Sequence, residues 1–284
     1  MHRLRFPLLI LLASGVLSCA KETSVENDGT RGPALGTDCR PSQVVLTDTA
    51  TRIGVFSLLT RFGATGRAVS VEAYDSVSGT SLFDFPLVYI GDTMRELNGY
   101  FLLEPSGRVR SYVTSDTVGA AVETTRYDYT YDANGYLSKK ELFSSLLPVN
   151  TPLVRFTYAW AGQNLTAVEG RIVVPGFERM LFKSVLEYDA TQTVKNFLPV
   201  FPDAAEATLS IMALDLGRKS RNLLKRVSTS SYDDTGMLDE TLTTEFSDPY
   251  FSADGYLLAW TVSGDEPVAL PFFVGRNVFR YHCR

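Results

Sequence analysis

The residue types that most often carry out catalysis are scarce in this chain. Its 284 residues include two histidines, His2 and His282. A Ser/His/Asp triad or a His-Glu-x-x-His zinc site needs histidine at a defined spacing, so the sequence holds almost no material for either. We therefore expect no catalytic residues, no metal site and no cofactor.

Carboxylates are the other residues that could perform chemistry, because the chain contains 32 Asp and Glu. Two carboxylates about 5–10 Å apart suffice for glycoside hydrolysis, and such a pair leaves no sequence signature. A carboxylate-based hydrolase is thus a remote alternative, since most acidic residues simply solvate a protein surface.

Two acidic turns contain residue types that also occur in calcium loops. They are Asp132-Ala133-Asn134-Gly135 and Asp233-Asp234-Thr235-Gly236. The alternating ligand register and the final bidentate Glu of a calcium loop are missing. We favour turn formation, in which Asp accepts backbone hydrogen bonds and Gly adopts a positive φ.

The two tryptophans, Trp160 and Trp260, are candidates for stacking on sugar rings, because aromatic faces often serve polar ligands. Core packing is the alternative, and it is the one that we favour. Nucleic acid is not an expected ligand, because Lys and Arg total 27 against 32 acidic residues and the net charge is −5.

The N-terminus predicts export. Arg3 and Arg5 precede an apolar stretch that is too short to span a bilayer but typical of a secretory signal. The stretch ends in Val16-Leu17-Ser18-Cys19, which resembles a bacterial lipobox, although a residue smaller than Leu17 is usual there. We expect residues 1–18 to be removed and Cys19 to be lipidated. An ordinary signal peptide is the alternative.

Residues 19–38 are rich in Gly, Thr and charged residues and should form a flexible tether. Residues 39–284 should form a single domain with Cys39 and Cys283 at its ends. These two cysteines lie in an oxidising compartment if the protein is exported, so we expect a disulfide between them rather than two buried thiols.

One spacing recurs along the domain: an aromatic or large apolar residue, three residues, then glycine. Its six glycines are Gly66, Gly107, Gly135, Gly162, Gly236 and Gly255. Polar residues before these glycines suit tight turns, and the flanks alternate with period two, as in Tyr127, Tyr129 and Tyr131. The pattern predicts a series of β-hairpins.

The fold class that follows is all-β, an antiparallel meander of about 12–14 strands forming a curled sheet or a closed barrel. One short helix is expected near 204–216, because Asp203 and Glu206 resemble a capping box and Leu209, Met212 and Leu216 recur at helical spacing. Charges on many strands argue against a membrane-spanning barrel, which needs an apolar outer band.

The turns also resemble a known repeat. Tyr131-Asp132-Ala133-Asn134-Gly135-Tyr136-Leu137 and Tyr232-Asp233-Asp234-Thr235-Gly236-Met237-Leu238 are similar to the YD repeat of Rhs-type proteins. Together with the lipobox and the tether, they resemble Bacteroidota envelope lipoproteins of unknown function described as having a porin-like β fold. The resemblance implies architecture and compartment, and the family offers no catalytic residues to carry over.

Four Asp-Ser/Thr-apolar triplets resemble the O-glycosylation motif of Bacteroidota envelope proteins. Their hydroxyl residues are Thr49, Ser76, Thr93 and Thr117. We expect a lipid-anchored outer-membrane protein, on the periplasmic or the cell-surface face, that acts as a non-catalytic binding module. Its ligand is a glycan in one interpretation. In the other, it is a scaffold that binds an envelope protein through an exposed sheet edge or the helix near 204–216.

Overall fold

The computed structural model describes residues 32–36, 39–47, 54–97, 99–118, 121–148, 150–195, 214–265 and 274–283. These residues form 17 β-strands, and none of them is helical. The strands are β1 (Cys39–Thr47), β2 (Gly54–Phe62), β3 (Ala68–Asp75), β4 (Ser81–Pro86), β5 (Val88–Ile90), β6 (Thr93–Arg95), β7 (Gly99–Leu103), β8 (Val109–Val118), β9 (Ala121–Tyr131), β10 (Leu137–Ser144), β11 (Pro152–Ala161), β12 (Asn164–Ile172), β13 (Arg179–Thr193), β14 (Asn222–Tyr232), β15 (Leu238–Phe251), β16 (Leu257–Gly264) and β17 (Gly275–Cys283).

The strands form because apolar and polar residues alternate along them. In β11, Phe156 and Tyr158 are buried while Thr157 and Ala159 are exposed, as expected when successive side chains point to opposite faces. The buried residues of all strands meet in one core inside the curled sheet. Burying the large aromatic side chains of this core stabilises the fold by roughly 2 kcal/mol each.

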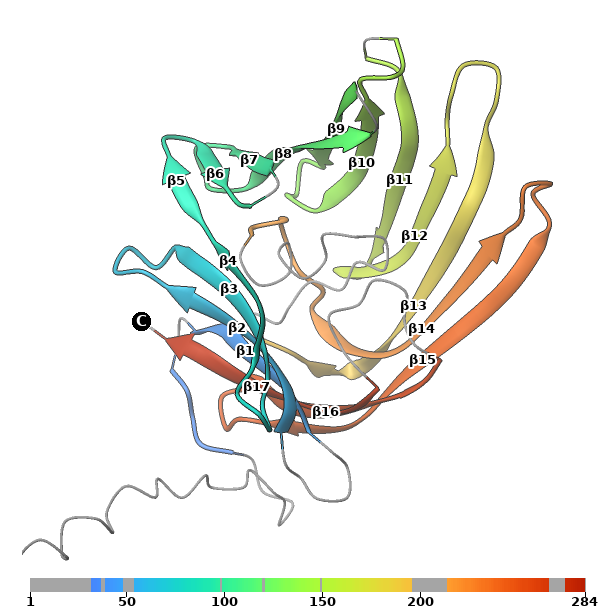
Figure 1. Ribbon diagram of the computed structural model, residues 1–284. Helices are drawn as coiled ribbons and strands as arrows, with labels where there is room; N and C mark the ends of the chain where they lie inside the picture. The colour runs from blue at the N-terminus through green and yellow to red at the C-terminus, as the bar shows by residue number, and fades with distance from the viewer. Residues whose placement is uncertain are drawn as a thin grey trace, which may run out of the picture.

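The sheet is a nearly closed antiparallel barrel, because β17 pairs with β1 and so joins the two ends of the meander (Figure 1). Its described strands pair with their neighbours in chain order except at one place. There, β4 pairs with β3 and β5 pairs with β6, but β4 and β5 are joined only through Leu87. The prediction of an all-β antiparallel meander is confirmed.

The barrel has two distinct ends because consecutive antiparallel strands alternate in direction. We call the end where β1 begins and β17 finishes the proximal end, and the opposite one the distal rim. The hairpin loops with Gly66, Gly107, Gly135, Gly162 and Gly255 lie at the proximal end, and the loop with Gly236 lies at the distal rim. All six glycines have a positive φ, between 56° and 94°.

The strand count is higher than the expected 12–14, because β5 and β6 have three residues each and show no clear alternation. The helix near 204–216 falls mostly outside the described residues. Its last residues, Leu214 to Leu216, are extended, and Asp215 forms a parallel bridge with Arg108. The signal peptide, Cys19 and residues 19–31 of the tether also lie outside the described residues.

The outward face of β10–β13 carries a ladder of ion pairs. Its contacts are Lys139–Glu141 at 2.8 Å, Arg155–Glu141 at 2.9 Å, Lys183–Glu169 at 3.0 Å and Arg171–Glu169 at 3.3 Å. Such partly exposed pairs contribute about 0–1 kcal/mol each, so their main consequence is a polar outer surface.

Candidate functional site

The acidic turns of the repeat have a structural role. The Asp132 carboxylate accepts hydrogen bonds from the backbone N–H of Asn134 and of Tyr136, both at 2.9 Å. Asp233 accepts from the N–H of Thr235 and of Met237 in the same way, at 2.8 and 3.0 Å. The pKa of Asp233 is lowered, mostly by a hydrogen bond from the Thr235 hydroxyl and further by these backbone bonds. The carboxylates therefore shape turns.

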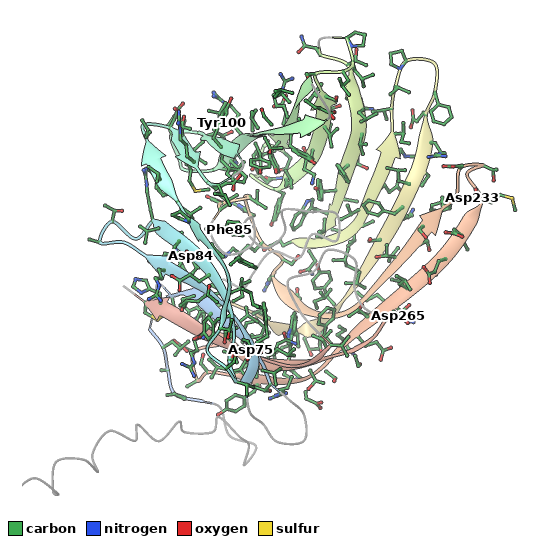
Figure 2. All side chains as sticks on the ribbon, viewed as in Figure 1. Asp75, Asp84, Phe85, Tyr100, Asp233 and Asp265 are labelled. Carbon is green, nitrogen blue, oxygen red and sulfur yellow. A yellow bond between two sulfur atoms is a disulfide. The ribbon has the colours of Figure 1, made fainter. Side chains whose placement is uncertain are left out.

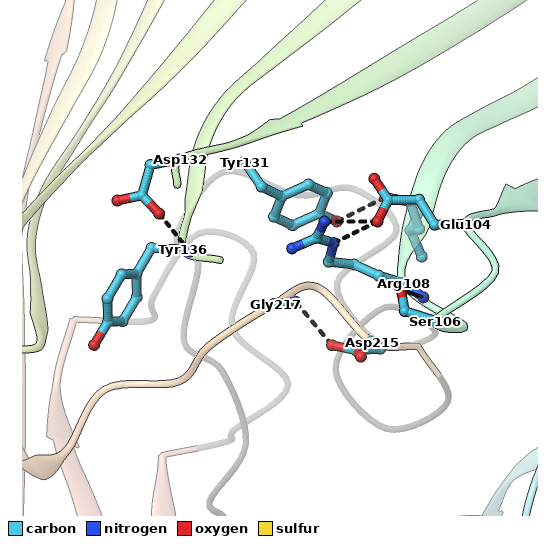
Figure 3. A network of polar contacts seen from close by, with 9 residues as sticks. Glu104, Ser106, Arg108, Tyr131, Asp132, Tyr136, Asp215 and Gly217 are labelled. Atoms are coloured by element: carbon cyan, nitrogen blue, oxygen red, sulfur yellow. Dashed lines mark hydrogen bonds and ion pairs between the residues drawn. The ribbon is translucent and has the colours of Figure 1, made fainter. Parts of the chain in front are cut away.

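The segment 214–221 crosses the proximal end on top of three repeat turns (Figure 3). The backbone N–H of Val109 donates to the carbonyl of Asp215 at 2.9 Å, and that of Arg218 donates to the carbonyl of Gly135 at 2.9 Å. The N–H of Arg221 then donates to the carbonyl of Gln163 at 3.1 Å. The segment thus ties neighbouring hairpins together before β14 begins.

A cation–aromatic cluster lies beneath this segment. The Arg108 guanidinium stands 4.1 Å from the Tyr131 ring centre and forms an ion pair of 2.6 Å with Glu104 (Figure 3). The Tyr131 hydroxyl donates to the carbonyl of Val109 at 2.7 Å. Burial raises the pKa of Tyr131 well above its ordinary value, and the charge of Asp215 adds to this. The phenol is therefore a neutral donor.

Gly217 is the point of closest approach in the cluster. Its φ is +87°, and a β carbon there would come within 2.5 Å of the Gly135 carbonyl oxygen and 3.0 Å of the Tyr131 ring. Its N–H donates to the Asp215 carboxylate at 2.9 Å. Only glycine fits this position, and it allows the backbone of the segment to lie directly on the Gly135 turn.

Two lysines lie among the inward-facing groups. Lys140 is 2% exposed, and its ammonium lies 4.3 Å from the Phe156 ring centre and 5.3 Å from that of Tyr127. Burial lowers the pKa of Lys219 to about 8, and the nearby charge of Asp215 partly opposes this. The Lys140 ammonium and the two rings beside it form cation–π contacts.

The two tryptophans occupy different environments. Trp260 is 1% exposed and packs against Phe246 and Phe279, so its faces belong to the core, the use that we favoured. Trp160 is partly buried, lies 4.5 Å from the Tyr136 ring and donates its indole N–H to the carbonyl of Leu137 at 2.8 Å. Of the two, Trp160 alone retains some exposed surface.

The general acid of a glycoside hydrolase has a raised pKa. Every described carboxyl with a shifted pKa has it lowered, by ion pairs or by turn hydrogen bonds. Glu72, which lies opposite Asp84 on β3 and β4, has its pKa lowered by hydrogen bonding to Arg61.

Cys39 and Cys283 form a disulfide, as expected, between directly paired residues of β1 and β17. The preceding residues 32–36 rest on the β15–β16 loop: the N–H of Gly32 donates to the carbonyl of Phe251 at 2.8 Å. The N–H of Gly36 donates to the Asp254 carboxylate at 2.9 Å. The end of the expected tether is therefore fixed at the proximal end.

The four candidate O-glycosylation residues differ in setting. Thr49 lies outside the described residues, and Thr117 lies in β8. The Ser76 hydroxyl is 2.8 Å from that of the buried Ser57, whereas Thr93 is partly buried beside Asp92. Among the described residues, no helix is long and apolar enough to cross a membrane.

Sequence reasoning allowed for an exposed sheet edge but did not locate it at β4 and β5. Within the described residues, β4 pairs on one side with β3 and β5 on one side with β6. Leu82, Val88 and Ile90 project from these strands and are 53–59% exposed. Pro86 and Asp84 are residue types that blunt an edge against unwanted pairing.

Comparisons with known proteins relate this chain to others by fold. No protein-family model matches it, and no curated protein matches it. A solved structure of a porin-like protein from Bacteroides uniformis matches 86% of this chain and 96% of its own, with a TM-score of 0.55 and 13% identity. A porin-like protein from Bacteroides vulgatus matches 86% and 99%, with a TM-score of 0.52 and 14% identity. The barrel-like sheet is therefore shared with this group of porin-like proteins.

Proposed function

We propose that this chain is an exported, lipid-anchored protein of the outer membrane that acts as a non-catalytic binding module for an envelope protein. The observation that carries export is the Cys39–Cys283 disulfide, because such bonds persist in oxidising compartments. The lipobox-like Cys19 supplies the anchor in this proposal. The likeness in fold to porin-like proteins of Bacteroides supports an envelope setting.

The interior geometry favours a protein ligand over a small substrate. Inward cations are stacked on aromatic rings, and the turn carboxylates are bonded to backbone amides. A polar group that is already paired gains little from a ligand, because it must first give up its present partner. Recognition is thus assigned to the outer surfaces, including the open β4 and β5 edges, where an extended polypeptide could add as a strand.

The test of anchoring compares the wild-type chain with Cys19→Ala in the native host. Labelled palmitate should enter the wild-type protein but not the variant, and the variant should leave the membrane fraction. An exported but unlabelled wild-type protein would show an ordinary signal peptide and overturn the anchor. Alkylation of both proteins without reductant should leave Cys39 and Cys283 unmodified.

A glycan ligand is the second candidate, and the partial exposure of Trp160 beside Tyr136 favours it. Native gels cast with a panel of polysaccharides would show retardation of the wild-type protein. Trp160→Ala should then abolish the shift, while Trp260→Phe, in the core, should keep it. Clearing of the polymer would instead support the carboxylate hydrolase. No shift on any polysaccharide would support the protein ligand.

A further inference from the structure

The exposed apolar side chains of the barrel are distributed unevenly between its two ends. Fourteen large apolar residues are exposed among the described residues, and eight of them lie in one of six hairpin loops of the distal rim or within two residues of one. These eight are Val77, Leu82, Val122, Leu146, Phe177, Met237, Leu238 and Val274. By the same criterion, the described part of the proximal hairpin loops has two, Val69 and Ile90, and both lie in the flanking strands.

This pattern differs from ordinary scattered exposure. Single exposed apolar residues occur on most proteins and need no explanation. Here one stands at each of six hairpin loops around one rim, and Val77, Leu146 and Met237 are 70%, 69% and 69% exposed. Figure 1 shows the loops of the β10–β11, β12–β13 and β14–β15 hairpins along the same border of the barrel.

Hydrogen bonds fix the backbone of the loops at three of these residues. The N–H of Val77 donates to the Asp75 carboxylate at 2.8 Å, and the N–H of Leu146 donates to the Ser144 hydroxyl at 3.1 Å. The N–H of Phe177 donates to the carbonyl of Val174 at 2.9 Å. A surface that is ordered before binding loses less conformational entropy when a partner covers it.

The charge of the rim is negative. The described parts of these six loops, with three flanking residues on each side, carry eight acidic side chains, three of which are labelled in Figure 2. They are Asp75, Glu123, Glu178, Asp233, Asp234, Asp239, Glu240 and Asp265. The same residues include three arginines, and all are engaged: Arg171 pairs with Glu178 at 3.3 Å, Arg179 pairs with Asp234 at 2.6 Å, and Arg276 donates to the carbonyl of Asp248 at 2.7 Å.

The rim lies opposite the end of the barrel at which residues 32–36 are attached. Those residues bond to the β15–β16 loop at the proximal end, and Cys19, the residue proposed to carry the lipid, precedes them in the chain. The 15 residues of β13 extend about 50 Å along the barrel wall. The distal rim is therefore the end of the barrel farther from the attached N-terminal segment.

From this combination we propose that the distal rim docks an envelope protein that presents basic side chains around an apolar surface. The proposal rests on the proposed function and names the surface that performs it. Charge complementarity selects this partner. A second copy of the chain would bring acidic rims together, and anionic lipid would be repelled by the same carboxylates.

The experiment uses the full lipoprotein in its native host. A photo-crosslinking phenylalanine analogue replaces Phe177 or Met237 at the rim, or Val88 at the β5 edge as a matched exposed position. The rim positions should crosslink to one protein, identified by mass spectrometry, whose attached peptides are rich in Lys or Arg. Leu146→Asp/Phe177→Asp/Met237→Asp should lower co-purification of that protein at least tenfold, whereas Val88→Asp/Ile90→Asp, at the β5 edge, should leave it unchanged.

Other outcomes overturn the rim assignment. Crosslinks to lipid, to a second copy of this chain or to an acidic protein each name a different occupant. A partner captured only from Val88, and lost only in Val88→Asp/Ile90→Asp, moves the interface to the β5 edge and leaves the proposed function standing. If no position captures a protein although Cys19 is lipidated and the rim variant folds with its disulfide intact, both the rim and the protein-binding function are wrong.

Discussion

Cys39 and Cys283 are direct neighbours in the β1–β17 ladder although 244 positions separate them in sequence, so one covalent bond holds the seam of the barrel. The strands on either side of that seam are the first and last of the meander. The disulfide closes a long loop in the unfolded chain, and this closure removes much of the conformational entropy of the unfolded state.

Removing the disulfide should destabilise the barrel as a whole. We expect Cys39→Ser/Cys283→Ser to lower the free energy of unfolding by up to about 5 kcal/mol, and the melting temperature by about 10 °C or more. Thermal unfolding followed by circular dichroism measures this. Cys19→Ala alone should melt like the wild type, and equal melting of the double variant would show that the β1–β17 ladder closes the seam unaided.

Gly217→Ala should destabilise the proximal end. The new β carbon would meet the Gly135 carbonyl oxygen at 2.5 Å, in addition to the strain of a φ of +87°. We expect a loss of about 2–4 kcal/mol. Gly176→Ala is the matched control, because its φ is +78° and nothing lies within 4 Å, so it should lose about 1 kcal/mol. Equal losses in urea unfolding would contradict the close contact.

The hairpins could be predicted because the interactions that form them are local. The Asp132 carboxylate and the amide of Tyr136 are four residues apart, and the same spacing separates Asp233 from Met237. Strand alternation is local in the same sense. Turn positions and the fold class are therefore visible in the sequence.

The assembly of those hairpins depends on contacts that sequence patterns do not encode. Residues 214–221 bond to three neighbouring turns, contacts between distant parts of the chain that the helical spacing ending at Leu216 does not indicate. Trp160 and Trp260 both lie in strands, yet only the position of each in the closed barrel decides that Trp260 is buried. The single-sided pairing of β4 and β5 is likewise a property of the closed sheet.

The stability of the protein should rise with pH in the range set by Lys219. Its folded pKa is about 8, below the value of about 10.5 in the unfolded chain. Between these values the unfolded state binds more protons, so the free energy of unfolding increases with pH, by on the order of 3 kcal/mol. Below about pH 8 the penalty for burying the charge is constant.

Lys219→Met removes this titration and serves as the reference. The variant should be the more stable protein at pH 7, and the difference should shrink as the pH rises from about 8 to about 10.5. Ionisation of tyrosines near pH 10 affects both proteins equally and so cancels in the difference. A difference that does not change with pH would place Lys219 in a solvated position.

Asp254 should control the attachment of residues 32–36. Its carboxylate accepts the N–H groups of Leu35 and Gly36, and the hydroxyl of Ser252 is the largest cause that lowers its pKa to about 2. The folded pKa lies below the unfolded value, so this attachment is complete above about pH 4 and is lost as the pH falls through about 2. Asp254→Ala should release the segment at every pH, because no carboxylate remains to accept the two amides.

Hydrogen exchange measures this release. Exchange of the Leu35 and Gly36 amides should accelerate in Asp254→Ala and stay slow in Asp233→Ala, which alters an equivalent turn at the opposite end. Unchanged protection in Asp254→Ala would show that the Gly32 backbone bonds hold the segment without the carboxylate.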